Sequence, residues 1–249
     1  MNEWTVEKSA ELYGIDVWST GYFRINAKGN IEVTPDGPDG ARVDLYELTN
    51  DLRERGIRVP LLLRFTEILK SRIELISGCF SKAIKDHNYQ GQYRGVYPIK
   101  VNQQRHLVED LIRFGGVHKL GLECGSKPEL LIVLAMEQSS DNLIICNGFK
   151  DLEYVETAIL SQKLGRNTII VVDRLSELPI IIQIAKKFEM RPRIGFRAKL
   201  YSKGSGKWMD SSGAHSKFGL TPPELVRGIN MLKENNMMDC LELFHFHIG

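Results

Sequence analysis

The feature that most limits the fold is a regular alternation of apolar, strand-like runs and amphipathic, helix-like segments after residue 94. The first five runs start about 25 residues apart. The six runs lie at 95–101, 120–124, 143–147, 168–173, 193–200 and 241–248. Helical patterns fill the gaps at 104–115, 127–138, 151–164 and 176–190, and another begins near Thr221. Strict alternation with short links predicts a parallel sheet with crossover helices.

Two α/β architectures are built in this way. No dinucleotide-binding glycine fingerprint accompanies the units, so the pattern favours a TIM-type (β/α)8 barrel cut off two strands early. A doubly wound open sheet is the alternative. The last apolar run, 241–248, has no following element to cover it. We therefore interpret the chain as the amino-terminal part of a longer protein.

The residues before the repeat form a separate segment, 1–90, ahead of six βα units at 91–249. We expect this segment to belong partly to a β domain and partly to the approach to the barrel. Its expected elements are a helix at 5–14, hairpin strands at 22–26 and 30–34, a helix over 43–52 closed by Gly56, an extended stretch at 60–65 and a long helix reaching Lys85.

Composition narrows the function classes. Of the 249 residues 43% are apolar and 26% are charged, which is ordinary for a folded globular protein. A net charge of +2 gives no electrostatic footprint for nucleic acid or an anionic membrane. No secretory signal or bilayer-length apolar stretch is visible, and the four scattered cysteines form no disulfide framework. We expect a cytoplasmic protein.

In a βα-barrel the active site is built at the carboxyl ends of the strands. Polar side chains of several kinds are expected there. They are Lys100 and Asn102 after the first strand, Glu123 to Lys127 with Glu129 after the second, Cys146 to Gly148 after the third, Asp173 and Arg174 after the fourth, Arg197 and Lys199 after the fifth, and His245 and His247 on the sixth.

Three chemistries compete for this set. A phosphate-binding P-loop at Gly204 to Lys207 is rejected, because Tyr201 and Trp208 stand where the motif needs Gly and Ser or Thr. We read the stretch from Ser202 as a flexible loop over the site. Metal-assisted hydrolysis is the second chemistry, because His245 and His247 lie two residues apart on a strand and share a face, where two imidazoles can chelate zinc. That site needs a third ligand from later strands.

The third chemistry is a covalent aldehyde cofactor on Lys100. A lysine at a buried strand end with cationic neighbours has a lowered pKa, which suits such a bond. Pyridoxal phosphate would also need a flat partner, for which His247 is a candidate, and polar groups, for which Arg197 and Glu123 are candidates. Two structural alternatives stay open. His247 could be a core histidine, and Arg197 could pair with Glu123 or Asp173.

Several motifs together resemble the family of biosynthetic arginine decarboxylases, from about residue 13 to the final glycine. They are Val96–Gln103, Gly121–Leu130, Ile145–Asp151, Gly204–Trp208, Ser216–Leu220 and His245–Gly249. The wider group, the alanine-racemase-like (fold type III) pyridoxal phosphate enzymes, shares only the strand-one lysine, a Ser-Lys-x-Glu, a Lys-Phe-Gly and a His-x-Gly.

The resemblance implies a lyase that converts L-arginine to agmatine and CO2 for putrescine and spermidine biosynthesis. Lys100 matches the lysine that carries the cofactor, and His247 matches the histidine stacked on its ring. Arg197, Glu123 and Glu129 match residues near the cofactor. Magnesium as a second cofactor and a homodimer or higher homo-oligomer with shared active sites are also implied.

The family's phosphate loop, its carboxylate for the pyridine nitrogen and its carboxyl-terminal β domain would lie after residue 249. We therefore expect these 249 residues to bind pyridoxal phosphate weakly and to be inactive alone. The nearest alternative is ornithine or diaminopimelate decarboxylase. A non-enzymatic pyridoxal phosphate-binding protein is opposed by the long amino-terminal segment and by the 202–219 insertion.

Overall fold

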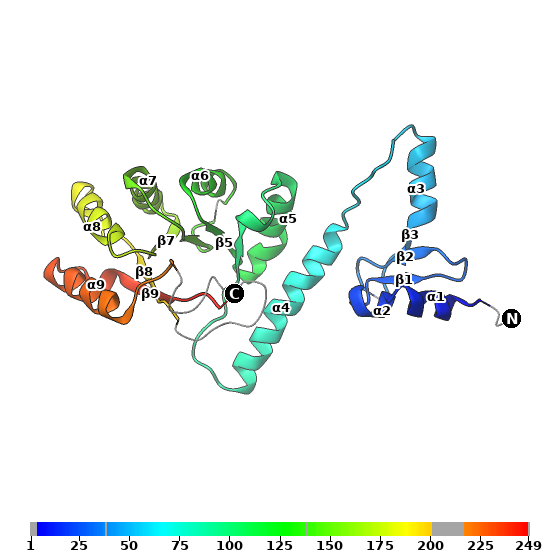
Figure 1. Ribbon diagram of the computed structural model, residues 1–249, viewed down its shortest axis with the longest axis horizontal. Coiled ribbons are helices and arrows are strands. Elements are labelled where there is room, and N and C mark those ends of the chain that lie inside the picture. The colour runs from blue at the N-terminus through cyan, green and yellow to red at the C-terminus, as the bar shows by residue number, and fades with distance from the viewer. Residues whose placement is uncertain (1–3, 38, 138, 201–216, 249) are drawn as a thin grey trace. The chain divides into compact units, whose positions relative to one another are not determined.

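The computed structural model describes residues 4–37, 39–137, 139–200 and 217–248 (Figure 1). The chain forms two compact units, Met1–Gln92 and Tyr93–Gly249. The earlier unit holds the irregular amino-terminal segment, and the later unit holds the strand–helix repeat.

The first unit is built on a small antiparallel sheet in the order β1-β2-β3. Its strands are β1 (Phe23–Ile25), β2 (Ile31–Val33) and β3 (Val43–Asp44), and its helices are α1 (Val6–Leu12), α2 (Ile15–Trp18), α3 (Leu45–Glu54) and α4 (Thr66–Asp86). The predicted hairpin is confirmed, since Phe23 is opposite Val33 in an antiparallel pair. The long helix ending near Lys85 is confirmed as α4.

The short helix expected at 5–14 is confirmed as α1, and Gly14, in a left-handed conformation (φ 58°), separates it from α2. One prediction for this unit was wrong in detail. The helix expected from Val43 starts two residues later. Val43 pairs with Val33 in the sheet, and the carboxylate of Asp44 then caps α3 by accepting from the backbone N–H groups of Tyr46 and Glu47.

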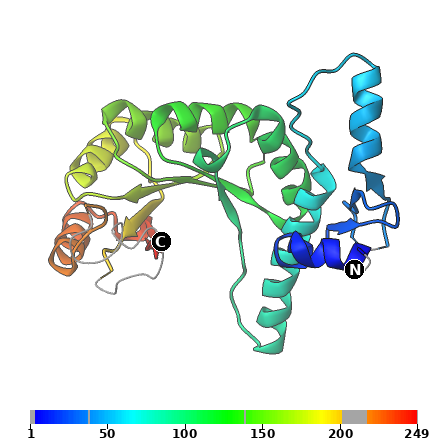
Figure 2. The ribbon, with the colours of Figure 1, turned by 45° about the vertical axis from the view of Figure 1, so that its right-hand side comes forward.

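The second unit is a six-stranded parallel sheet in the order β4-β5-β6-β7-β8-β9 (Figure 2). Its strands are β4 (Val96–Pro98), β5 (Gly121–Cys124), β6 (Leu143–Cys146), β7 (Asn167–Val172), β8 (Ile194–Arg197) and β9 (Leu241–His245). The intervening helices are α5 (Arg105–Gly115), α6 (Lys127–Met136), α7 (Leu152–Lys163), α8 (Glu177–Lys187) and α9 (Pro222–Glu234), with 3-10 turns at Ile99–Val101, Gly116–His118 and Met238–Cys240.

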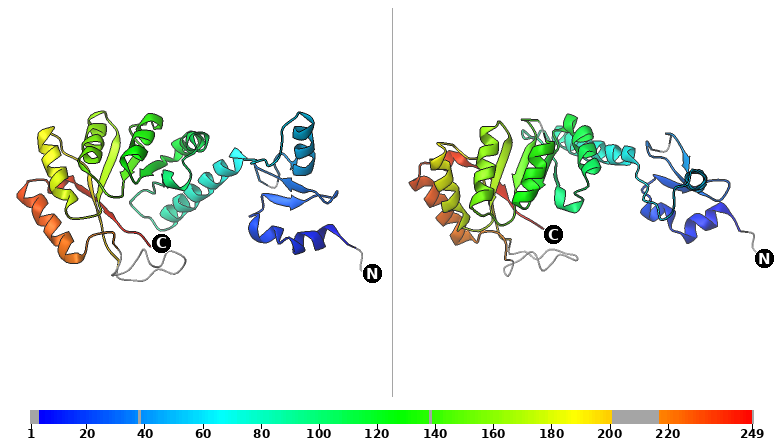
Figure 3. Two further views of the ribbon diagram at one scale, coloured as in Figure 1. Left: turned by 45° about the horizontal axis from the view of Figure 1, so that its top comes forward. Right: turned by 90° about the horizontal axis from the view of Figure 1, so that it is seen from above.

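The strand order decides between the two architectures. A doubly wound sheet reverses its strand order at a switch point, whereas here each strand pairs with the next one in the chain. The helices follow one another along one side of the sheet (Figure 3). Their side of the sheet carries the main core, which includes Leu122, Ile144 and Val172. The barrel prediction is therefore confirmed as six consecutive parallel strands with crossover helices between them, and the doubly wound alternative is wrong.

Helix ends follow the punctuation of the sequence. Pro128 lies in the first turn of α6, where Ser126 caps the helix. Gly165, just after α7, takes a positive φ of 79°. Thr221 and Glu224 form a reciprocal capping box that starts α9. Among the helices of the described residues, none has both the length and the apolar character that crossing a bilayer requires.

The first strand of the sheet is shorter than predicted. We expected a run over 95–101 with Lys100 at its buried end, but pairing with β5 stops at Pro98, opposite Glu123. Proline lacks the N–H that would continue the ladder, and Ile99–Val101 form a 3-10 turn instead. Lys100 therefore lies on a turn after the strand, and its side chain is exposed.

Candidate active site

The alternation of side chains along each strand determines which residues face away from the helices. Leu122 and Cys124 of β5 are buried against the helices, so Glu123 between them points to the opposite face of the sheet. The same alternation puts Asn147, Asp173 and Arg197 on that face, at the carboxyl end of the strands. We call this region the carboxyl edge. One layer deeper, the same face is apolar, with Ile145 and Val171.

Lys100 and His247 reach the carboxyl edge from opposite ends of the sheet, one after β4 and the other two residues beyond β9. His247 lies close enough to Lys100 and Arg197 to be influenced by both charges. Partial burial lowers the pKa of His247, and the nearby cations of Arg197 and Lys100 lower it further. Glu123 opposes this effect. Four of the five predicted site residues, His247, Arg197, Lys100 and Glu123, thus lie close enough to interact electrostatically.

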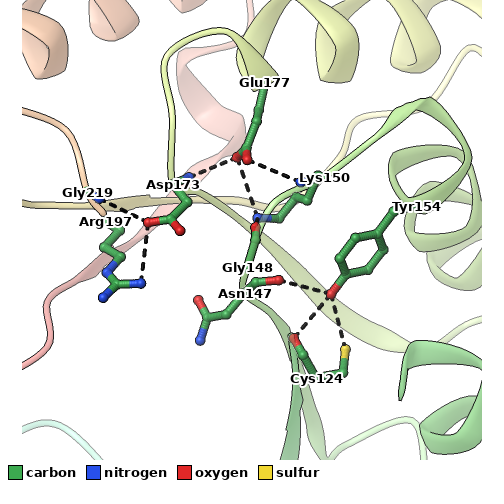
Figure 4. Close-up of polar contacts among 9 residues, drawn as sticks. All are labelled: Cys124, Asn147, Gly148, Lys150, Tyr154, Asp173, Glu177, Arg197 and Gly219. Carbon is green, nitrogen blue, oxygen red and sulfur yellow. Dashed lines mark hydrogen bonds and ion pairs between the residues drawn. The ribbon is translucent and has the colours of Figure 1, made fainter. Parts of the chain in front are cut away.

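Arg197 is held by a carboxylate on the neighbouring strand. Its guanidinium lies 3.3 Å from the carboxylate of Asp173, which is only 2% exposed (Figure 4). The guanidinium also lies 5.0 Å from the centre of the Phe218 ring. The ion pair with Asp173 is one of the two structural alternatives that the sequence left open for Arg197. The pair fixes the guanidinium at the carboxyl edge.

Glu123 is a buried carboxylate that is only half satisfied. Its Oε1 accepts a hydrogen bond of 3.2 Å from the Asn147 amide. The other oxygen, Oε2, is buried and has no hydrogen-bond partner among the described residues, and the same holds for the Asn147 amide oxygen and Nδ1 of His245. Unsatisfied buried polar atoms are rare. Three of them at one edge of a sheet indicate a site prepared for a polar bound group.

Glu129 has a different position from the other predicted site residues. Its Oε2 accepts a 2.6 Å hydrogen bond from the backbone N–H of Gly125, and its Oε1 accepts a 2.9 Å bond from the side-chain amide of Gln103. Gln103 follows the Lys100 turn. Glu129 therefore ties the turn that carries Lys100 to the loop after β5.

His245 is a half-buried imidazole beside this site. Burial lowers its pKa to about 4, with a further contribution from the Arg197 cation. The imidazole is therefore neutral near pH 7. In the part of the chain that the structure describes, no group of three or more His, Cys, Asp or Glu side chains is arranged to hold a metal ion.

Sequence reasoning missed a buried ion pair behind the carboxyl edge. Lys150 and Glu177 have exposed side-chain fractions of 0% and 1%, and their charged atoms lie 3.5 Å apart. The two residues are separated by one βα unit, so no local charge pattern indicated the pair. Lys150 was noted only as part of a motif, and Glu177 only as part of a helix. The four-residue spacing from Asp173 to Glu177 was the one available signal.

A second missed cluster lies on the helix side of the sheet. The Tyr154 hydroxyl contacts the backbone oxygens of Cys124 and Asn147 at 3.1 and 3.2 Å. The Sγ atoms of Cys124 and Cys146 are 3.7 Å apart. Burial raises the pKa of the Tyr154 hydroxyl, and the contact with Cys146 and burial raise that of the Cys124 thiol. Both groups stay neutral, so this cluster is structural.

Similarity to known proteins shows the family of the chain. The family described as "Pyridoxal-dependent decarboxylase, pyridoxal binding domain" matches residues 79–249. The chain belongs to this family. It is 50% identical over 246 residues to the biosynthetic arginine decarboxylase of Nostoc sp., covering 99% of this chain and 36% of that protein. It is 51% identical to the Phocaeicola vulgatus protein of the same name, covering 100% and 39%.

Solved structures of decarboxylases agree with the fold. The crystal structure of the biosynthetic arginine decarboxylase from Campylobacter jejuni superposes with a TM-score of 0.82 at 36% identity, covering 95% of this chain and 38% of that one. Diaminopimelate decarboxylase from M. jannaschii has a TM-score of 0.64 at 22% identity, covering 91% and 48%, and shows the fold alone. The chain spans 36–39% of the length of the curated relatives it matches.

The carboxyl edge suits the pyridoxal group after which this decarboxylase family is named. A primary amine, Lys100, is exposed and available. The unpaired Oε2 of Glu123 offers a buried acceptor, and Arg197 offers a fixed cation. The expected loop from Ser202 and the glycines at 204–206 lie outside the described residues, except for Lys217 to Gly219.

Proposed function

We propose that the chain contributes the lysine-bearing half of the active site of a pyridoxal phosphate-dependent decarboxylase that converts L-arginine to agmatine and CO2. The proposed enzyme has the length of the curated relatives and is called the full-length protein below. The observation that carries the proposal is the convergence of Lys100, Glu123, Arg197 and His247 at one edge of the sheet. The choice of arginine rests on the similarity to proteins named biosynthetic arginine decarboxylases.

Each residue has a distinct task in this proposal. Bound pyridoxal phosphate would supply an electron-accepting ring for the electrons of the broken carbon–carboxylate bond. Lys100 would hold the cofactor covalently, and its exposed position on a turn leaves its amine room to leave and return. His247 would lie against the ring. Its lowered pKa favours the neutral imidazole, which carries no charge to repel Lys100 or Arg197.

Arg197, Glu123 and Glu129 complete the proposed site. Arg197, fixed by Asp173, and the unpaired oxygen of Glu123 would contact polar groups of the cofactor. Glu129 would act indirectly, since its bonds to Gly125 and Gln103 hold the turn that carries Lys100. Magnesium as a second cofactor and a homo-oligomer with shared active sites are further parts of the proposal, taken from the family resemblance. A cytoplasmic location is also proposed, from the composition of the chain.

The decisive experiment treats the full-length protein with pyridoxal phosphate and borohydride and then locates the label by peptide mass spectrometry. The label is expected on Lys100 and is expected to be lost in Lys100→Ala. Lys127→Ala, a lysine at the start of α6 near the same edge, is the matched control and should keep the label. A Lys100→Ala protein that still decarboxylates arginine would falsify the proposal.

The substrate is decided by a separate assay of CO2 release. The full-length protein is expected to act on arginine and to leave ornithine and diaminopimelate unchanged. Release from either of the other two amino acids would keep the cofactor assignment and replace the substrate. The 249-residue chain alone is expected to take up little cofactor and to release no CO2.

A further inference from the structure

The proposed function leaves the buried pair Lys150 and Glu177 unused. Moving two charges out of water costs several kcal/mol each, and attraction within the pair offsets this only when further hydrogen bonds satisfy both groups. A hydrophobic pair of the same size would fill the space at lower cost. The pair is therefore expected to hold other groups of the protein in place.

Glu177, at the start of α8, joins two loops of the carboxyl edge. Its Oε1 accepts a 3.2 Å hydrogen bond from the backbone N–H of Lys150, and its Oε2 accepts a 2.9 Å bond from the backbone N–H of Asp173. The Lys150 ammonium donates to the Gly148 carbonyl at 2.7 Å. The loop after β6 and the end of β7 are thus bound to one carboxylate (Figure 4).

Asp173 extends this network to the site. While its backbone N–H is held by Glu177, its carboxylate pairs with Arg197 at 3.3 Å and accepts a 3.0 Å hydrogen bond from the backbone N–H of Gly219. Arg197 is therefore the last member of a chain of contacts that starts at Lys150. Most residues of this contact series are buried, since the side chains of Lys150, Glu177 and Asp173 are at most 2% exposed.

We propose that Lys150 and Glu177 are positioning residues that act through Asp173 to hold the Arg197 guanidinium at the carboxyl edge. The inference rests on the proposed function, because Arg197 matters only if this edge binds the cofactor. Among the described residues, Lys150 and Glu177 make no contact with Lys100 or His247, and the contacts that link them to Arg197 run through Asp173. Active-site side chains generally need contacts with surrounding residues that keep them in position.

A double-mutant cycle tests this path in the full-length protein. Lys150→Met removes the ammonium, and Asp173→Asn removes the charge that holds Arg197 while keeping an acceptor for Gly219. The measured quantity is the affinity for pyridoxal phosphate, followed by visible absorbance. Each single variant is expected to bind about tenfold more weakly, by analogy with outer partners of metal ligands. The double variant is expected to be no weaker than Asp173→Asn alone.

The control is a surface ion pair that also involves α8. Lys187 of α8 lies 2.7 Å from Glu156 of α7, with 57% and 30% of the side chains exposed. Lys187→Met is expected to leave the affinity unchanged. Equal affinity in Lys150→Met and the parent would overturn the proposal. Additive losses of about a hundredfold in the double variant would do the same, because they would place Lys150 on a path independent of Asp173.

If Lys150→Met does not fold, Lys150→Arg takes its place in the cycle, since it keeps the positive charge but changes the length and shape of the side chain that carries it.

A second readout separates failure of the inference from failure of the proposed function. If the parent binds no pyridoxal phosphate, the proposed function fails. The cycle is then read on the pKa of His247 by NMR, which should rise when Arg197 is released. An unchanged His247 pKa in Asp173→Asn would overturn the positioning role.

Discussion

At the carboxyl edge, burial changes the pKa of His245, and this change makes the stability of the folded protein depend on pH. Its pKa is lowered from 6.5 to about 4 in the folded protein. Between those pH values the unfolded chain binds more protons than the folded chain. The free energy of unfolding therefore decreases as the pH falls through this interval. His245→Gln removes this term, so its melting temperature should fall less than that of the parent when the pH is lowered from about 7 to about 5.

The control for this measurement is His106→Gln on α5, whose side chain is exposed. It should follow the parent at both pH values. Parallel acid responses of the parent and His245→Gln would contradict the assignment of a neutral, half-buried imidazole to this position.

The Tyr154 hydroxyl gives a second test at the scale of one residue. Tyr154→Phe removes contacts to the backbone oxygens of Cys124 and Asn147 in a site that water does not reach. We expect a loss of about 1 kcal/mol in the free energy of unfolding, measured with urea. Thr157→Val on the same helix removes a solvent-exposed hydroxyl bond to the Glu153 carbonyl and should cost less. A larger loss in Thr157→Val would refute the argument from burial.

At the scale of elements, the loops after β5 and β6 are fitted against each other. Gly148 has a φ of 75°, and a Cβ there would collide with the carbonyl oxygen of Gly125. Gly165, after α7, has a nearly equal φ of 79° with open space around it. Alanine at either position meets the left-handed penalty of about 1–2 kcal/mol. Gly148→Ala should be the more destabilising, and borohydride labelling of Lys100 should fall only there.

The elements also show how far a sequence alone carries the fold. The regular alternation of strand-like and helix-like segments predicts six parallel strands in sequence order. Apolar runs of strand length alternate with segments whose apolar residues recur with the 3.6-residue period of a helix. The alternation within strands predicts which polar residues share the carboxyl edge. Tertiary contacts decide the rest. Pro98 ends β4 before Lys100, and Val43 joins a sheet that its own helical pattern did not indicate.

Partners far apart in the sequence are the hardest to predict. Lys150 and Glu177 are 27 residues apart, and each looks like an ordinary solvated charge in its own segment. They meet, out of water, because β6 and β7 are parallel neighbours, which puts the loop after β6 beside the start of α8. The same limit applies to Arg197, for which the sequence left Glu123 and Asp173 as alternative partners and the fold selects Asp173.

At the scale of the whole molecule, the outer strands of the six-stranded sheet, β4 and β9, each have one strand neighbour within the described residues. On β9, Phe244 is 62% exposed, and alternation puts it on the side that the helices cover elsewhere. An exposed apolar edge strand is a site for aggregation. The chain spans 36–39% of its curated relatives, and in the proposed full-length protein the next βα unit would pair with β9 and cover Phe244.

Phe244→Lys should therefore have opposite effects in the two contexts. In the isolated 249-residue chain, a lysine on the edge opposes strand pairing between molecules and should slow aggregation, measured by light scattering. In the full-length protein the same lysine would be buried without a partner and should lower the melting temperature, because an unpaired buried charge is strongly unfavourable. Val117→Lys is the control, since Val117 is 84% exposed on a turn and not on a strand. It should change neither quantity. A full-length Phe244→Lys protein as stable as its parent would refute the closing of the barrel against β9.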